Sequence, residues 1–204
     1  MPFKNMANLV LYLLLLLLHL RSTAATPPAS AAANFIKSSC RATRYPSLCI
    51  HSLSVYASKI QQSDQQLAQA ALSVSLSSAQ STTVFVSRQL KAAGIKPREY
   101  QAIRDCTRNM ADAVVQLNRS IGELGQIGRP SAQDFEWHMS NVQTWVSAAI
   151  TAANTCIDGF SDPTMIGDLK SGITARVTTC SQVTSNALAL VALFGEKMAK
   201  GRNG

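Results

Sequence analysis

The sequence predicts an all-α protein: an up-down-up-down bundle of four long helices, preceded by an N-terminal helical hairpin and held by two disulfides. Three observations lead to this prediction. Apolar residues recur at three- and four-residue steps in four long segments. Short turns with Gly or Pro separate these segments, which favours antiparallel neighbours. Five cysteines follow an apolar leader, which is typical of a secreted chain with disulfides.

The first 24 residues are typical of a secretory signal peptide. Lys4 gives a basic start, residues 9–18 are an apolar run, and small residues at 22–24 suit cleavage. This run is short for a membrane span, although an uncleaved anchor is the alternative. We expect no second apolar stretch of membrane length without charges, so the mature protein is expected to be soluble. Residues 25–33, rich in Pro and Ala, are expected to be a flexible lead-in.

The helical domain is expected to span 34–199, with a tail at 200–204. It opens with a hairpin of two short helices, 34–42 and 46–59, because Tyr45-Pro46 interrupts the helical pattern. Pro46 suits the first turn of the second helix.

The first two long helices are expected at 64–93 and 97–124. Asp64 is the expected cap of the first and Gly94 its stop. A strand over 75–83 is an alternative because that stretch is rich in Ser and Thr, but no other segment would pair with it. Pro97 begins the second helix, which carries the most regular apolar pattern of the chain.

The last two long helices are expected at 132–158 and 164–199. Ser131 and Asp134 resemble a capping box for the first of them, and Gly159 follows its end. Val142, Val146, Ala149, Ala153 and Cys156 place its apolar stripe against the other helices.

The cysteines give a test of distance. Cys40 and Cys49 flank the Tyr45-Pro46 break, so a local bridge is expected. Cys106 and Cys156 lie at heights that differ by only about 5 Å if their helices are antiparallel, whereas Cys180 lies about 18 Å away in height. We therefore expect a second bridge, Cys106–Cys156, and a free thiol at Cys180. That thiol is interpreted as a buried apolar residue; a reactive nucleophile is the alternative.

Catalysis is not expected. The sequence contains no GxSxG, HExxH, CxxC or P-loop pattern, and its acids are scattered. His51 and His138 are expected at the surface, and no metal or cofactor is expected. Asn118-Arg119-Ser120 is a sequon, so Asn118 is a candidate for glycosylation.

The charge is basic. Lys4 and Arg21 lie in the leader, so the remaining chain has 17 basic and 11 acidic residues and a net charge of +6. Weak adhesion to an acidic extracellular matrix is one interpretation, and a merely solvated surface is the other. Nucleic acid is not expected as a partner, because the basic residues are scattered and the compartment is extracellular.

Several short motifs together resemble one family. They are Cys40 and Cys49 around Tyr45-Pro46, Asp105-Cys106, the run 142–149, the run 155–160 and the run 185–190. Over about 34–195 the chain resembles the plant pectin methylesterase inhibitor and invertase inhibitor family. That resemblance implies a four-helix bundle with a hairpin and two disulfides. It implies a protein that does not catalyse, but forms a one-to-one complex covering the active-site cleft of its target enzyme in the cell wall or apoplast. It also implies that the acidic matrix to which a basic chain would adhere weakly is pectin.

The resemblance favours pectin methylesterase as the target. Invertase inhibitors carry Pro-Lys-Phe in the turn after the fourth cysteine, whereas this chain has Ser161-Asp162-Pro163-Thr164-Met165 there. An invertase inhibitor is the first alternative, and a helical module for a small apolar ligand is the second.

The resemblance also implies the contact residues. It places the inhibitory face on the second and third bundle helices, with Thr155 and Asp158 as contact positions. Arg108 stands where the family often has an acid, which affects target choice and pH dependence. The alternative for Thr155 and Asp158 is a polar pair that only solvates a helix end.

Overall fold

The described part of the chain, in a computed structural model, comprises residues 29–127, 132–165 and 167–202. The predicted signal peptide, residues 1–24, lies outside it. The elements are all helices: α2 (Ala29–Cys40), α3 (Pro46–Ser54), α4 (Ala57–Ile60), α5 (Asp64–Gln89), α6 (Pro97–Leu124), α7 (Ala132–Asp158) and α8 (Asp168–Arg202). The all-α prediction is confirmed.

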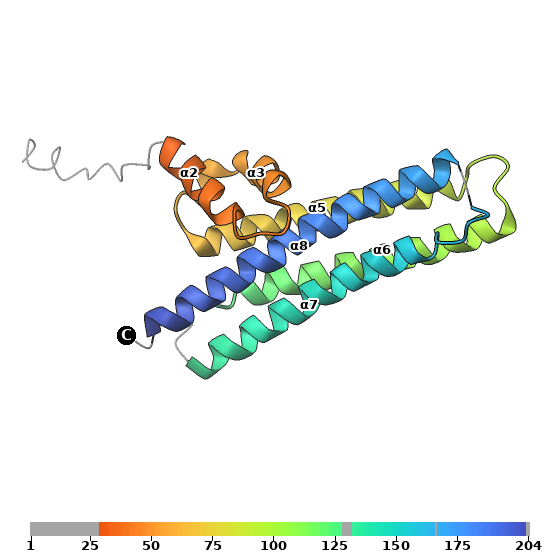
Figure 1. Cartoon of the computed structure of the whole chain (residues 1–204). Coiled ribbons are helices and arrows are strands. Elements are labelled where there is room, and N and C mark those ends of the chain that lie inside the picture. Colours follow the sequence, from red (N-terminus) through yellow and green to blue (C-terminus); the bar gives the residue numbers. More distant parts are fainter. Residues whose placement is uncertain (1–28, 128–131, 166, 203–204) are drawn as a thin grey trace, which may run out of the picture.

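The four long helices form a bundle (Figure 1). Each helix packs on the next along the chain, and α8 closes the ring against α5. Their directions alternate, as cross-contacts near the ends show. Gln65 Nε2 at the start of α5 donates to the carbonyl of Ile127 after α6, at 3.3 Å. Lys197 Nζ near the end of α8 lies 2.7 Å from Asp64 Oδ1.

Helix boundaries follow the local signals in most places. Both α6 and α7 span the predicted residues. Pro97 occupies the first turn of α6, and the Lys96 N–H donates to Glu99 Oε2 at 3.0 Å. The cap of α5 is Ser63 rather than the expected Asp64, because the Ser63 hydroxyl accepts from the Gln66 N–H at 3.3 Å. Ser131 lies outside the described residues.

Two long-helix ends differ from the prediction. Helix α5 ends at Gln89 rather than at residue 93, and Gly94 follows with a φ of 75°. Helix α8 begins at Asp168 rather than at residue 164. The Asp162 carboxylate accepts from the Thr164 N–H at 2.7 Å, which makes a turn there instead of a helix. At its other end α8 runs to Arg202, so residues 200–202 of the expected tail are helical.

The hairpin differs from the prediction in where its first helix begins and in an interruption of its second helix. Residues 29–33, expected to be part of a flexible lead-in, form the beginning of α2. They are helical because Ala32, Ile36 and Cys40 make a buried stripe at four-residue steps. The expected helix 46–59 is two helices, α3 and α4, interrupted at Val55 and Tyr56. Val55 is 79% exposed at this break.

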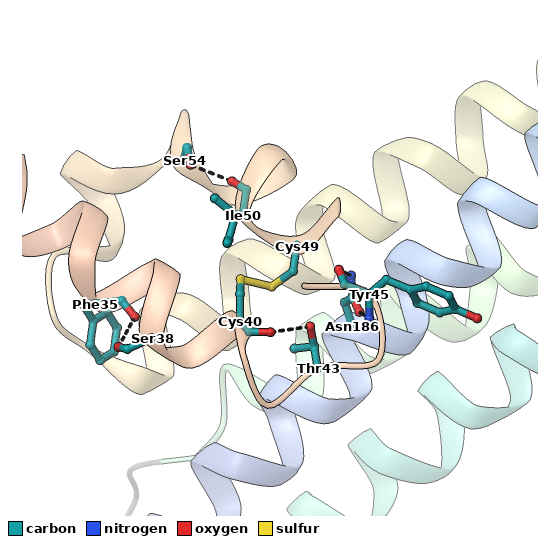
Figure 2. Close-up of a disulfide and its surroundings, with 9 residues drawn as sticks. All are labelled: Phe35, Ser38, Cys40, Thr43, Tyr45, Cys49, Ile50, Ser54 and Asn186. Atoms are coloured by element: carbon teal, nitrogen blue, oxygen red, sulfur yellow. Dashed lines mark hydrogen bonds between the residues drawn. A yellow bond between two sulfur atoms is a disulfide. The ribbon is translucent and has the colours of Figure 1, made fainter. Parts of the chain in front are cut away.

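The hairpin packs on α5 and α8 (Figure 1). Cys40 and Cys49 are bridged across its turn, with Cα atoms 5.6 Å apart (Figure 2). Tyr45, which precedes Pro46 with a φ of -127° and a ψ of 72°, contacts α8 through its backbone. Its N–H donates to Asn186 Oδ1 and its carbonyl accepts from Asn186 Nδ2, both at 3.0 Å.

By length and composition alone, helix α8 could cross a membrane. This differs from the expectation that the chain has no second apolar stretch of membrane length. Its segment Asp168–Gly201 has a window of mean hydropathy 1.3, and 56% of that window is buried inside the protein. The burial is that of a helix in the core of a bundle, where Ile173, Val177 and Val191 are fully buried.

Candidate functional site

The hairpin leaves the outer face of α6 and α7 free. The hairpin covers α5 and α8, which lie on the opposite side of the bundle (Figure 1). Helices also make more rigid platforms for a binding surface than loops do. The α6–α7 face is therefore the first candidate for a binding surface.

Three cross-links fix the register of α6 against α7. Cys106 and Cys156 are bridged, with Cα atoms 4.2 Å apart. Near the start of α6, Arg98 forms an ion pair with Asp162, in the turn after α7. At the other end, Glu123 Oε1 lies 2.8 Å from His138 Nδ1. Because covalent and polar links hold the pair along its length, residues on its surface keep fixed relative positions.

The disulfide brings the three expected contact residues to one level. Arg108 is two residues beyond Cys106, while Thr155 and Asp158 lie immediately before and two beyond Cys156. All three are exposed. The Thr155 hydroxyl donates to the Thr151 carbonyl at 2.9 Å, so its oxygen remains able to accept a hydrogen bond from a partner.

Arg108 belongs to a small charged group on α6. Asp105 Oδ1 lies 3.6 Å from Arg108 Nη1 and 3.8 Å from Arg104 Nε. The three side chains are 43–68% exposed, so solvent screens these pairs and their contribution to stability is small. Charges held loosely at a surface are free to exchange partners when another protein approaches.

Asp158 is placed against the preference of its helix. It is the last residue of α7, where the helix dipole is negative and an acidic side chain is unfavourable. Among the residues that the structure describes, no hydrogen bond or ion pair of its carboxylate offsets this. A residue that destabilises its helix and makes no compensating contact is typical of a functional position.

A strip of uncharged side chains, small except for Trp137, runs along the exposed side of α7. Its members recur at three- and four-residue steps and are all exposed: Trp137, Ser140, Thr144, Ser147, Thr151 and Thr155. Eighteen residues separate its ends, which corresponds to about 27 Å of helix. Because its Ser and Thr side chains are short, the surface of another protein can approach the helix closely along this strip.

Trp137 is the large residue of this strip, and the sequence interpretation missed it. It is 62% exposed, and its ring meets the His138 ring edge-on at 5.1 Å between centroids. Exposed tryptophans on a rigid support are frequent anchors of protein interfaces. The available signal was its place on the helix, on the side opposite Val142 and Val146.

His138 is half-buried, so the expectation of a surface residue was wrong for it; His51 is exposed. Glu123 Oε1 receives a hydrogen bond from Asn141 Nδ2 at 2.8 Å and lies equally close to His138. Trp137 therefore rests on a side chain that polar contacts hold between α6 and α7.

The remaining predicted residues lie elsewhere. Cys180 is 2% exposed on α8. Burial raises the pKa of its thiol, and the hydroxyls of Ser78, Thr184 and Thr82 only partly offset this. Asn118 is exposed on α6, with its Nδ2 donating to the Val114 carbonyl at 3.1 Å.

The chain matches a known protein family over most of its length. A family model described as plant invertase/pectin methylesterase inhibitor matches residues 34–190. Pectinesterase inhibitor 9 of Arabidopsis thaliana is 50% identical over 200 residues, 97% of each chain. Pectinesterase inhibitor 11 of the same plant is 45% identical over 193 residues, 92% of this chain and 96% of that one.

Solved structures agree in fold. A mutant form of a pectin methylesterase inhibitor from Arabidopsis has a TM-score of 0.61 at 21% identity, covering 76% of this chain and 93% of that one. The fold and its free face define a disulfide-linked helical bundle suited to binding another protein. The chain belongs to the plant invertase/pectin methylesterase inhibitor family.

Proposed function

We propose that this protein is a secreted inhibitor of pectin methylesterase that works in the apoplast and cell wall. The observation that carries the proposal is its identity of 50% to Pectinesterase inhibitor 9 across 97% of both chains. An inhibitor of this kind needs no cofactor. Retained methyl esters on pectin would limit calcium cross-linking of the wall.

The proposed mechanism is occlusion by a one-to-one complex. The α6–α7 face lies across the active-site cleft of the esterase, and Thr155, Asp158 and Arg108 contact it beside the Cys106–Cys156 bridge. Support comes from their exposure at one level of a cross-linked helix pair. Trp137 extends this contact to the other end of α7. Asn118 remains a candidate for glycosylation because it is exposed.

The alternatives have less support. The family model includes invertase inhibitors, but the turn 161–165 lacks the Pro-Lys-Phe of that branch. For a small apolar ligand, the space beneath the hairpin, lined by Leu53, Ala71 and Val183 among others, is about 10 Å³. A space of that size holds one water molecule at most.

Titration of mature protein against esterases and invertases tests the proposal. We expect inhibition of at least one plant pectin methylesterase to be complete near one equivalent, and no inhibition of cell-wall or vacuolar invertases. Size-exclusion chromatography is expected to show a one-to-one complex. A panel of esterases left fully active between mildly acidic and neutral pH contradicts the proposal.

A matched pair of variants locates the face. Trp137→Ala removes an exposed aromatic ring from α7, and Val55→Ala removes an apolar side chain that is 79% exposed on the hairpin, away from the α6–α7 face. Loss of an interface anchor raises the inhibition constant by about 30-fold or more, and we expect this for Trp137→Ala alone. Equal inhibition by both variants and the wild type places the contact elsewhere.

A further inference from the structure

A groove opens along the seam of α5 and α8, on the side of the bundle opposite the α6–α7 face. The hairpin covers one half of this seam, and beyond the hairpin the seam is bare (Figure 1). The groove there has a volume of about 410 Å³, and its polar lining comprises Ser78, Ser81, Thr82, Arg176 and Thr179. That volume lies within the range of about 300–1,000 Å³ that is usual for ligand sites.

Small residues on α8 keep the groove open. Gly172 and Ala175 complete the lining. A Cβ at Gly172 would meet Phe85 Cζ at 3.8 Å, which is an ordinary contact, so packing does not require glycine there. Glycine inside a helix costs about 0.5–1 kcal/mol relative to alanine. Helix α8 therefore carries an unfavourable residue whose effect is to leave space at this point.

Arg176 gives the groove a fixed positive charge. Its guanidinium carbon lies 4.4 Å from the centre of the Phe85 ring, a cation–π contact that holds the side chain in place. No acidic partner of Arg176 lies within ion-pair distance in the part of the chain that the structure describes. Arg176 is the charged residue of the lining, so the groove favours an anion.

The hydroxyls indicate what else the ligand must offer. Ser81 Oγ donates to the Ser78 carbonyl and Thr179 Oγ1 to the Ala175 carbonyl, each at 3.0 Å. With their hydrogens engaged, these oxygens offer lone pairs and accept from a ligand. A sulfate ion only accepts at neutral pH and a hydrogen phosphate ion has one or two hydrogens to donate, whereas a sugar donates several hydroxyl hydrogens from positions around its ring. The combination of an unpaired guanidinium and accepting hydroxyls fits a sugar that carries a carboxylate.

We propose that the α5–α8 groove binds a uronic acid unit of an acidic polysaccharide. The sugar carboxylate pairs with Arg176, and its hydroxyls donate to Ser81 and Thr179. Because the groove lies across the bundle from the α6–α7 face, the polymer and a protein partner bind at the same time. The site does not depend on which enzyme the other face inhibits.

Binding of galacturonic acid oligomers to isotope-labelled mature protein tests this site by NMR. We expect saturable shifts in residues 78–82 and 172–179. Arg176→Gln is expected to weaken binding by about tenfold or more, since it removes the charged hydrogen bonds. Arg108→Gln, which makes the same change of charge on the α6–α7 face, is expected to leave the affinity unchanged. Ala175→Leu fills the groove without a change of charge and is expected to abolish the shifts.

Several outcomes overturn the proposal. Equal weakening by Arg176→Gln and Arg108→Gln means general adhesion to a basic surface. Equal affinity for fully methyl-esterified oligomers means that the carboxylate is not bound, and equal affinity for inorganic phosphate means a simple anion site. Esterase inhibition is measured on the same variants, and we expect Arg176→Gln to inhibit as the wild type does. A wild type that binds the oligomers but inhibits no esterase leaves this site intact and refutes the proposed function.

Discussion

Asn186 on α8 binds both backbone polar groups of Tyr45, 141 residues earlier in the chain (Figure 2). The carboxamide donates to the Tyr45 carbonyl and accepts from its N–H, as another peptide group would. Pro46 follows Tyr45 and prevents the turn from continuing α2 as a helix. The hairpin is thus attached to the bundle at its own turn, next to the Cys40–Cys49 bridge.

Replacement of Asn186 tests this attachment. In Asn186→Ala the two hydrogen bonds are lost and the partly buried backbone groups of Tyr45 have no partner on α8. We expect the free energy of unfolding to fall by about 2 kcal/mol in urea titrations. Amide exchange in residues 43–60 is expected to accelerate most. Gln182→Ala, one turn earlier on α8, is the control, and faster exchange spread evenly over the bundle contradicts the assignment.

The Cys106–Cys156 bridge should contribute more to stability than the hairpin bridge. In the chain-entropy model it restricts a much longer loop of the unfolded chain, with a sequence separation of 50 rather than 9. The model gives about 4 kcal/mol for the long loop and about 3 for the short one. Urea unfolding of the Cys106→Ser/Cys156→Ser and Cys40→Ser/Cys49→Ser variants measures the two. A larger loss from the hairpin pair shows that strain or residual structure dominates.

Local signals explain which elements were predictable. Helices α6 and α7 were placed correctly because Pro97 and Gly159 mark boundaries beside regular apolar patterns. Helix α8 begins late because Asp162 turns the chain with its side chain, a local alternative that competes with the helix. Helix α2 begins early because Ala32 is buried in its first turns and the helix packs mainly on α3 and α4, and burial of that kind is a tertiary effect.

The candidate face was only partly predictable, for a related reason. The family motifs pointed to Thr155, Asp158 and Arg108. Trp137 lies opposite the apolar stripe that the sequence already predicted for α7, so its exposure was predictable, but exposure alone does not mark a side chain as part of an interface. The polar link from Glu123 to His138 joins two helices, so neither segment alone indicates it.

Cys180 should be unreactive in the folded protein. Burial raises the pKa of its thiol, so the thiolate that reacts with disulfide reagents is scarce at pH 8. We expect a slow reaction with Ellman's reagent under native conditions and one rapid equivalent in denaturant. The raised pKa also means that the stability from the protonated thiol is complete below about pH 8.5 and is lost as pH rises through the raised value. Cys180→Ala should remove that alkaline loss, and rapid native labelling contradicts the burial.

Asp162 should contribute to stability at mildly acidic to neutral pH. Hydrogen bonds from the Thr164 hydroxyl and N–H, assisted by Arg98, lower the pKa of its carboxyl. A lowered pKa gives stability that is present above the ordinary value, about 3.9, and is lost as pH falls through the lowered value. Asp162→Asn should therefore lower the melting temperature at pH 5–7, and the difference should disappear towards pH 2–3. A difference that persists at the lowest pH shows that packing, not charge, is responsible.

Asp158 should affect stability and inhibition in opposite directions. Its carboxylate lies at the negative end of the α7 dipole, so Asp158→Asn relieves an unfavourable interaction and should raise stability by up to about 1 kcal/mol. The same change removes a charge from the proposed contact and should weaken esterase inhibition by about tenfold. Asp112→Asn, an exposed acid in the middle of α6, is the control and should change neither quantity appreciably. If Asp158 only solvated the end of α7, Asp158→Asn would stabilise the bundle and leave inhibition unchanged. Higher stability together with weaker inhibition therefore requires contact between Asp158 and the esterase. Unchanged inhibition by Asp158→Asn would therefore assign Asp158 to solvation of the turn and leave the contact to Thr155 and its neighbours.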